Sequence, residues 1–366
     1  MRLESASINR RELLRLGLGA VAGGLVLGCR SPGLARSELV PVRVSWDLVQ
    51  RTVVGLRPWR PLGFRVEREL FGGKELIHNY GHGGAGLSLC WGSSEFAVEQ
   101  VASTAPQRCA VIGCGAMGLT TARLLQERGW AVTIYAKDLP PNTTSNVAGA
   151  TFSVGPGAAF SAEFLEVYDR VARQAFRHHE SRIGQGYGVR WIDEYAEATD
   201  ANLEELQTDP HFDLYRVKTL SKAEHPFPWQ RALKWRTLLI ETPIFMDRLV
   251  QEVRASGGRI VTQEFQDVAS VLVLEEDVIF NCTGIGARAL FGDSELIPIK
   301  GQYTILKPQP EVDYIAGAIP RKDGILIGTT GQFGEWSLEP DRDAERRYME
   351  RHRAFFEAMV LRQSGA

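Results

Sequence analysis

The sequence predicts an α/β protein with a parallel sheet between helices, joined to a second α+β domain with a mixed or antiparallel sheet. Three observations support this. The short apolar run from Arg108 to Ile112 is typical of a buried parallel strand. A glycine cluster follows it directly, with a helical stretch and a second apolar run behind it. The length of 366 residues is enough for two domains.

The glycine cluster has the spacing G-x-G-x-x-G and consists of Gly113, Cys114, Gly115, Ala116, Met117 and Gly118. A helix is expected from Leu119 to Arg128, ended by Gly129, and a strand from Ala131 to Tyr135. This order is the Rossmann fingerprint, in which the glycines allow a tight turn, close approach to a pyrophosphate, and close packing of helix on strand. The free N–H groups of the helix N-terminus favour the phosphates.

The contact to the ribose is less clear, because the acid that usually ends the second strand is missing. The strand ends Tyr135-Ala136-Lys137-Asp138, so either Asp138 takes this role or Lys137 lies across the adenosine. Downstream, the hydroxyls of Thr143, Thr144 and Ser145 precede the small residues Val147, Ala148 and Gly149. Hydroxyls can bond phosphate oxygens and small residues admit a flat ring. A polar loop that caps the next helix is an equally good interpretation of these residues alone.

Several motifs together resemble the D-amino-acid oxidase family. Tyr135-Ala136, Thr143 to Ser145 and Val147 to Gly149 resemble its flavin-binding start, and Asn281 to Gly284 resembles its second flavin contact, through Thr283 and Gly284. The stretches Ala318 to Arg321 and Gly324 to Thr330 resemble its substrate-side strands. The segment His78 to Ser88 resembles the family's closing motif, which would place Gly83, Gly84, Ala85, Gly86, Leu87 and Ser88 against the flavin ring.

The resemblance implies FAD as cofactor and Arg57, in Gly55 to Pro61, as the residue that binds the substrate carboxylate. Arg60 would then be the structural arginine of the pair. The implied reaction is hydride transfer from the α-carbon of a D-amino acid to flavin. Oxygen or another acceptor reoxidises the flavin, giving H₂O₂ with oxygen, and the imino acid hydrolyses to an oxo acid and ammonia.

The sequence departs from the family at its substrate tyrosines. One of them falls on Gly317, Tyr314 is the candidate for the other, Tyr303 is a more distant candidate, and Ala85 replaces the tyrosine of the glycine turn. The substrate therefore stays open. A related oxidase or dehydrogenase of another amine or an N-methyl amino acid, a non-catalytic flavoprotein, and an NAD-binding enzyme are the alternatives.

The motifs stand in a permuted order, because the closing motif and Arg57 precede the glycine cluster. We therefore expect a circular permutation of the family's sequence, which proteins tolerate when the original termini lie close together. The expected divisions are a signal (1–30), a linker (31–50), the first part of the FAD-binding domain (51–160), a mainly substrate-binding region with interleaved segments (161–260), the return of the FAD-binding domain (261–295), the substrate domain (296–340) and a C-terminal helix (341–366).

Helix and strand signals fill the second half of the chain. Ser161 is expected to cap a helix to about His179, and Thr242-Pro243 to open a helix that ends at Gly257-Gly258. Strands are expected at Val268 to Leu274 and Val278 to Phe280, and a charged helix at Asp341 to Met359.

Composition and charge exclude some classes of function. The net charge of −2 and the scattered Lys and Arg argue against a nucleic-acid partner. The spacing of His78 and His82 could suggest a metal pair, but it needs a helix that Asn-Tyr-Gly-His does not favour, so no metal is expected. Cys90, Cys109, Cys114 and Cys282 are expected to be small buried hydrophobes.

The N-terminus resembles a twin-arginine export signal. Arg10-Arg11 precedes a short apolar run from Leu16 to Leu27. Val26 to Cys29 resembles a lipoprotein processing site, although Leu27 is larger than the usual residue, so lipidation of Cys29 stays open. The expectation is export to the periplasm or to the outer face of the membrane. The sequence does not indicate an oligomeric state.

Overall fold

The computed structural model describes residues 39–103, 105, 107–153, 161–208, 211 and 214–365. The twin arginines and Cys29 lie outside the described residues, so export and lipidation stay predictions. Leu39–Ala366 forms one compact unit.

A six-stranded sheet carries the dinucleotide fingerprint. Its order is β2-β3-β10-β4-β5-β9, and all neighbours are parallel except β2 and β3. The strands are β2 (Arg65–Phe71), β3 (Lys74–Tyr80), β4 (Arg108–Ile112), β5 (Ala131–Ala136), β9 (Arg259–Thr262) and β10 (Val278–Asn281). The central strand β10 is buried throughout, as expected of a parallel strand covered on both faces. The predicted strands around the glycine cluster are confirmed.

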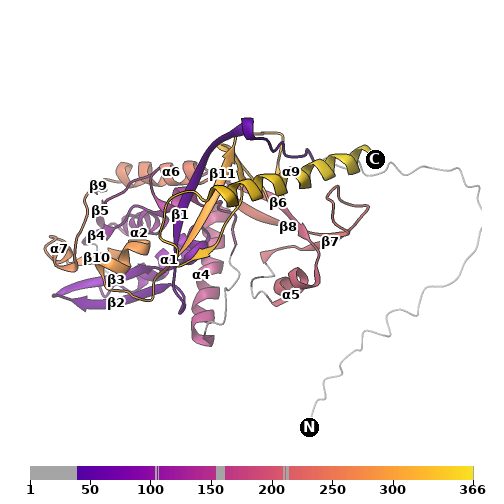
Figure 1. Cartoon of the computed structure of the whole chain (residues 1–366). Helices are drawn as coiled ribbons and strands as arrows, with labels where there is room; N and C mark the ends of the chain where they lie inside the picture. The colour runs from indigo at the N-terminus through magenta and orange to yellow at the C-terminus, as the bar shows by residue number, and fades with distance from the viewer. Residues whose placement is uncertain are drawn as a thin grey trace, which may run out of the picture. The chain divides into compact units, whose positions relative to one another are not determined.

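Helices pack around this sheet (Figure 1). They are α1 (Gly86–Glu99), α2 (Ala116–Glu127), α4 (Ala162–Ser181) and α6 (Thr242–Ala255). α1 packs against both α2 and α4, and α2 also packs against α6. α1 and α4 approach so closely at Gly92 that a methyl group there would lie 2.0 Å from the carbonyl oxygen of Val171. The helix that follows the glycine-rich closing motif is therefore a core element.

Two further sheets form the second part of the fold. The first contains β1 (Val49–Trp59), β11 (Ile297–Leu306), β13 (Ile319–Arg321), β14 (Gly324–Ile327) and β15 (Gln332–Phe333), all antiparallel. The second contains β6 (Val189–Glu197), β7 (Lys218–Ser221), β8 (Arg231–Ile240) and β12 (Tyr314–Ile315), with only β12 parallel to its neighbour. The predicted fold class is therefore confirmed.

The remaining elements are short, except for the last helix. They are α3 (Thr144–Val147), α5 (Asp200–Thr208), α7 (Val268–Leu272), α8 (Ala287–Leu290), α9 (Arg342–Ser364) and the 3-10 turns η1 (Trp46–Leu48), η2 (Gly83–Ala85) and η4 (Gly284–Gly286).

Some sequence-based boundaries need correction. The stretch from Val268 is not a strand, because the side chain of Asp267 caps the amide of Ser270 and starts α7. The cap of α6 is Glu241 rather than Thr242, and α9 runs further than predicted. The cap at Ser161 is confirmed by a bond from the amide of Phe164. Within the expected linker, Val42 and Val44 are buried in a core cluster with α9.

The cysteine prediction is confirmed for the four described cysteines, which are buried and free. Within the described part of the chain, no helix is long and apolar enough to cross a membrane. The same residues contain no cluster of side chains suited to hold a metal ion.

Candidate flavin and substrate site

The glycine cluster forms a tight turn that excludes side chains. Gly113 has φ +112°, and a methyl group on it would lie 2.4 Å from the carbonyl oxygen of Cys282. A methyl group on Gly118 would lie 1.9 Å from the carbonyl oxygen of Gly113, so only glycine lets α2 start against β4. The turn leaves the first amides of α2 at the carboxyl edge of the sheet, where a dinucleotide pyrophosphate binds in such folds.

The hydroxyl segment lies at this helix N-terminus. The Oγ of Ser145 accepts a 3.0 Å hydrogen bond from the amide of Ala116, and Thr143 Oγ1 donates to Asn146 Oδ1. The methyl group of Thr144 packs towards Gly55 of β1. The segment therefore links the start of α2 to the second sheet, and its part in cofactor binding stays a prediction.

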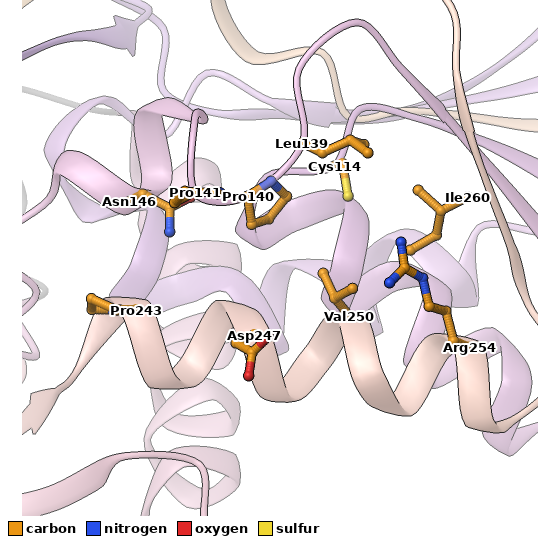
Figure 2. A pocket seen from close by; sticks show the side chains of 10 residues that line it. All are labelled: Cys114, Leu139, Pro140, Pro141, Asn146, Pro243, Asp247, Val250, Arg254 and Ile260. Atoms are coloured by element: carbon orange, nitrogen blue, oxygen red, sulfur yellow. The ribbon is translucent and has the colours of Figure 1, made fainter.

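A cavity of about 270 Å³ lies next to the glycine cluster. Figure 2 shows Cys114 and Pro140 facing Val250 and Arg254 of α6 across this space. Its position at the carboxyl edge of parallel strands is where nucleotides bind in open α/β sheets.

The two candidates for the ribose contact are both exposed. Lys137 and Asp138 follow the buried Ala136 at the end of β5, and the Nζ of Lys137 lies 4.0 Å from Glu264. Both residues therefore lie at the carboxyl edge of the sheet, at the end of β5.

A second chain segment reaches the same edge after β10. The amide and hydroxyl of Thr283 both donate to Asn281 Oδ1, at 3.2 and 2.7 Å. Gly284 follows with φ +58° and approaches Pro58 of β1. The predicted contact residues Thr283 and Gly284 therefore lie beside the strand that carries Arg57.

The glycine-rich closing motif forms η2 and the start of α1. Gly83 has φ +56° and packs on Trp59, and Met117 of α2 approaches Gly86. The Oγ of Ser88 accepts from the amide of Ser153 and donates to the carbonyl of Thr151. Leu87 is buried beneath the turn. The backbone amides of Gly84, Ala85 and Gly86 thus lie at the N-terminus of a helix. This end of the helix is next to the stretch of chain that follows Thr143 to Ser145.

Arg57 lies on β1 above the closing motif. Its Nη2 donates a 2.7 Å hydrogen bond to Thr329 Oγ1, and its Cδ lies near Gly84. Among the described residues no Asp or Glu forms an ion pair with it. Arg60, by contrast, pairs with Asp293 at 2.9 Å, so the expectation that Arg60 is the structural arginine agrees with its placement. A half-buried guanidinium without an acid is suited to bind an anionic ligand.

Tyr314 does not lie with Arg57, which corrects its assignment as a catalytic residue. Its hydroxyl donates to the carbonyl of Val40 at 2.9 Å, and its ring packs between Tyr195 and Phe227. Burial raises its pKa. Sequence proximity to the Ile-Pro pair was misleading, because β12 turns this side chain into the core below α9.

Tyr303 lies closer to the site than its distance in the sequence suggested. It follows Gly301 on the same face of β11, and its hydroxyl lies 2.7 Å from where a side chain of Gly149 would begin. Burial raises the pKa of Tyr303, and the positive charge of Arg57 opposes this rise. Thr329 and Tyr303 are the neighbours of Arg57 that sequence reasoning missed or placed far away.

A second cavity, of about 340 Å³, borders the closing motif. It is lined by Arg60, Phe64, His82, Gly84, Ala85, Leu89, Ser153, Phe164 and Tyr168, with two further glycines. The ring of His82 stacks on Phe64 at 4.7 Å, and burial lowers the pKa of His82 to about 3.

Comparison with known proteins identifies this arrangement. The family of FAD dependent oxidoreductases matches residues 108–365. The chain belongs to this family. FAD is its cofactor, and the side-chain-free turn at Gly113 and Gly118 fits the pyrophosphate of FAD. The match leaves out β3 and α1, although β3 lies inside the same parallel sheet.

Curated relatives within reach of sequence comparison include oxidases of amino acids. The chain is 28% identical over 244 residues to the D-amino-acid oxidase of Dictyostelium discoideum, covering 63% of this chain and 68% of that one. It is 27% identical over 260 residues to the D-aspartate oxidase of Homo sapiens, covering 67% and 74%. The crystal structure of glycine oxidase from Bacillus cereus has the same fold, with a TM-score of 0.53 and 16% identity over 69% of this chain and 80% of that one.

Proposed function

We propose that this FAD-dependent oxidoreductase oxidises the amine of a D-amino acid, and that Arg57 binds the substrate's carboxylate. The observation that carries the proposal is the guanidinium of Arg57, which has a hydroxyl partner at Thr329 but no acidic partner among the described residues. A planar guanidinium holds a carboxylate in two parallel hydrogen bonds and so fixes the position of the α-carbon. The names of the curated relatives support an amino acid as substrate.

The residues of the site supply positioning and electrostatics. Arg57 would set the position of the α-carbon. The amides of Gly84 and Gly86 at the helix N-terminus would stabilise negative charge that develops beside them, whereas the amide of Ala85 already donates to the carbonyl of His82. FAD, held at the turn of Gly113 and Gly118, would accept the hydride that leaves the α-carbon, and O₂ would then take up the two electrons with two protons to give H₂O₂. Water adds to the resulting imino acid, which releases ammonia and leaves the oxo acid. No general base is needed if the amine enters neutral.

A second candidate is a substrate with a secondary amine, such as an N-methyl amino acid. It is favoured by the small residue Ala85 in the closing motif and by the burial of Tyr314 in the core, because these leave more room around the amine. Both candidates need Arg57, whereas a simple amine does not.

The order of the motifs supports a circular permutation. β3 and α1 precede the matched region in sequence, yet β3 pairs with β10 and α1 packs on α2. We propose that the family's closing block now opens the folded part of the chain. We also propose, from Arg10-Arg11 and Cys29 alone, export by the twin-arginine route to the periplasm or to the outer face of the cell membrane, with lipid at Cys29 as one form of anchor.

The first experiment is an absorbance spectrum of the purified protein, repeated anaerobically with D- and L-amino acids and with N-methyl amino acids. A flavin spectrum that bleaches with D-amino acids supports the proposal. Bleaching only with N-methyl amino acids selects the second candidate. A flavin that dithionite reduces but no amino acid reduces would contradict both.

A further inference from the structure

A chain of buried polar side chains connects His82 to the N-terminal half of α2. It consists of His82, Ser93, Asn79, Ser94, Thr120 and Thr121, and all of these except His82 are fully buried. His82 directly precedes η2, and the other five residues come from α1, β3 and α2. None of these contacts is visible in the sequence, because each joins residues from different elements. We call this set the His82 chain.

The distances in the His82 chain are those of good hydrogen bonds. His82 Nε2 lies 2.7 Å from Ser93 Oγ, and Ser93 Oγ lies 2.7 Å from Asn79 Oδ1. Asn79 Nδ2 lies 3.3 Å from Ser94 Oγ and 3.2 Å from Thr121 Oγ1. The two oxygen atoms at 2.7 Å have the usual O–H···O separation, and the longer distances suit an amide N–H donor. The amide of Asn79 therefore has its oxygen towards Ser93.

This orientation fixes the direction of every proton up to the histidine. Ser93 has one hydroxyl proton, which it donates to Asn79 Oδ1. Ser93 must therefore accept from His82, so the proton of the neutral imidazole is on Nε2. Nδ1 then carries a free lone pair. No described residue donates to Nδ1, and His82 lines the second cavity beside Gly84 and Ala85.

We infer that His82 Nδ1 is a hydrogen-bond acceptor for an N–H group of a ligand in this cavity, and that Asn79 and Ser93 hold His82 in the required tautomer. Two sources supply such a donor at this place: the imide N–H of the flavin ring and the amine of the substrate. This inference rests on the proposed function for its ligand, but the tautomer rests on the protein alone.

The tautomer is tested by ¹⁵N spectra of the histidine side chains, with the His82 signals assigned by their loss in His82→Phe. The phenyl ring keeps the stacking on Phe64. In the wild-type protein we expect Nε2 to be protonated and Nδ1 to be unprotonated. In Ser93→Ala we expect a mixture of tautomers. Ser94→Ala is the matched control, because Thr121 still accepts from Asn79 and the His82 tautomer should not change. A protonated Nδ1 in the wild type, or equal effects of both serine variants, would overturn the inference.

The ligand is tested by binding. Losing one acceptor should weaken the ligand about tenfold. If the flavin is the donor, His82→Phe raises the Kd of the apoprotein for FAD, 3-methyl-FAD binds wild type and variant equally, and His82→Asn restores part of the loss. If the substrate is the donor, the Kd for FAD stays unchanged and the Kd for the amino acid rises in anaerobic titration. Unchanged binding of both ligands would refute the ligand role of Nδ1.

These outcomes separate the inference from the proposed function. A wild-type protein that binds no FAD would contradict the proposed function, while its ¹⁵N spectrum would still decide the tautomer. A protein that binds FAD and oxidises amino acids, but has Nδ1 protonated, would keep the function and refute this inference.

Discussion

Arg57 lies directly against Gly301: a methyl group on the glycine would lie 2.6 Å from Nη2 of the arginine. The pairing Gly55↔Gly301 puts both strands in register, so that Arg57 extends across the neighbouring strand without obstruction. Gly301→Ala should therefore displace the guanidinium and raise the KM for an amino acid about tenfold, with a smaller change in kcat. Gly331→Ala is the control, since its nearest neighbour would be 4.0 Å away. Equal KM values in both variants would count against the position assigned to the carboxylate.

Removing the guanidinium should have a larger effect than moving it. Arg57→Ala is expected to lower kcat/KM for an amino acid about 100-fold, because hydrogen bonds to a charged group are lost. Arg51→Ala changes an exposed arginine of the same strand, which pairs with Asp323, and should leave kcat/KM within about twofold. Steady-state rates with an amino acid and with the matching simple amine measure the difference. A loss of the same size for both substrates would argue against a carboxylate contact.

Gly118 has no room for any side chain. Its methyl group would lie 1.9 Å from the backbone oxygen of Gly113, which cannot move without breaking the turn. Gly118→Ala is expected to abolish FAD binding and to reduce soluble protein. Gly115→Ala meets only the hydroxyl of Ser145, at 3.1 Å, and should fold with weakened FAD binding. Flavin fluorescence titration ranks the two variants, and tighter binding by Gly118→Ala would contradict the close packing described.

Ala150 is strained. It has φ +57° in the loop after the hydroxyl segment, and its carbonyl accepts from the amide of Ile240. A non-glycine residue in this left-handed conformation destabilises the folded state by about 1–2 kcal/mol. Glycine avoids this strain, but it loses more backbone entropy on folding, which offsets part of the gain. Ala150→Gly should therefore raise the free energy of unfolding by about 0.5–1 kcal/mol. Guanidinium unfolding of the apoprotein checks this, and a lower midpoint with unchanged slope would contradict it.

His179 makes stability depend on pH. It is fully buried, its Nε2 donates to the carbonyl of Leu87, and burial lowers its pKa to about 3. Below a pH of about 6.5 this histidine is protonated in the unfolded chain but not in the folded chain. The free energy of unfolding therefore decreases as the pH falls. Replacing it by phenylalanine should make the pH dependence shallower by about 1.4 kcal/mol per pH unit between pH 6 and 4. Glu194, whose pKa burial raises to about 7, acts in the opposite sense. The variant must therefore be compared with the wild type at each pH.

The local signals of the sequence predicted the dinucleotide half well. β4, α2 and β5 lie where the apolar runs and the G-x-G-x-x-G spacing put them, because glycine turns and strand ends are encoded by neighbouring residues. Local signals predicted the wrong element where they favoured helix and strand about equally. Val268 to Leu274 has a strand-like composition, but the cap at Asp267 decides for a helix.

The residues around the substrate could not be predicted in the same way, because their positions depend on contacts between residues that are distant in the sequence. Tyr314 was assigned from its closeness to Ile319-Pro320, but side-chain direction depends on β12 and α9. Tyr303 reaches Gly149 only because β11 meets the loop that follows Thr143 to Ser145. For the same reason the bond between Asn79 and Ser93 could not be foreseen from the sequence.

The position of β3 has a consequence for how the chain folds. β3 lies between β2 and β10, and the hydrogen bond between His78 and Asn281 joins residues 203 positions apart. During synthesis β3 cannot pair with β10 until β10 has left the ribosome. Until then the apolar side chains of β3 and α1 lack their final partners. Contacts between residues so far apart in the sequence favour slow folding and aggregation. The unfinished N-terminal half is therefore the part of the chain that we expect to be most exposed to aggregation during synthesis.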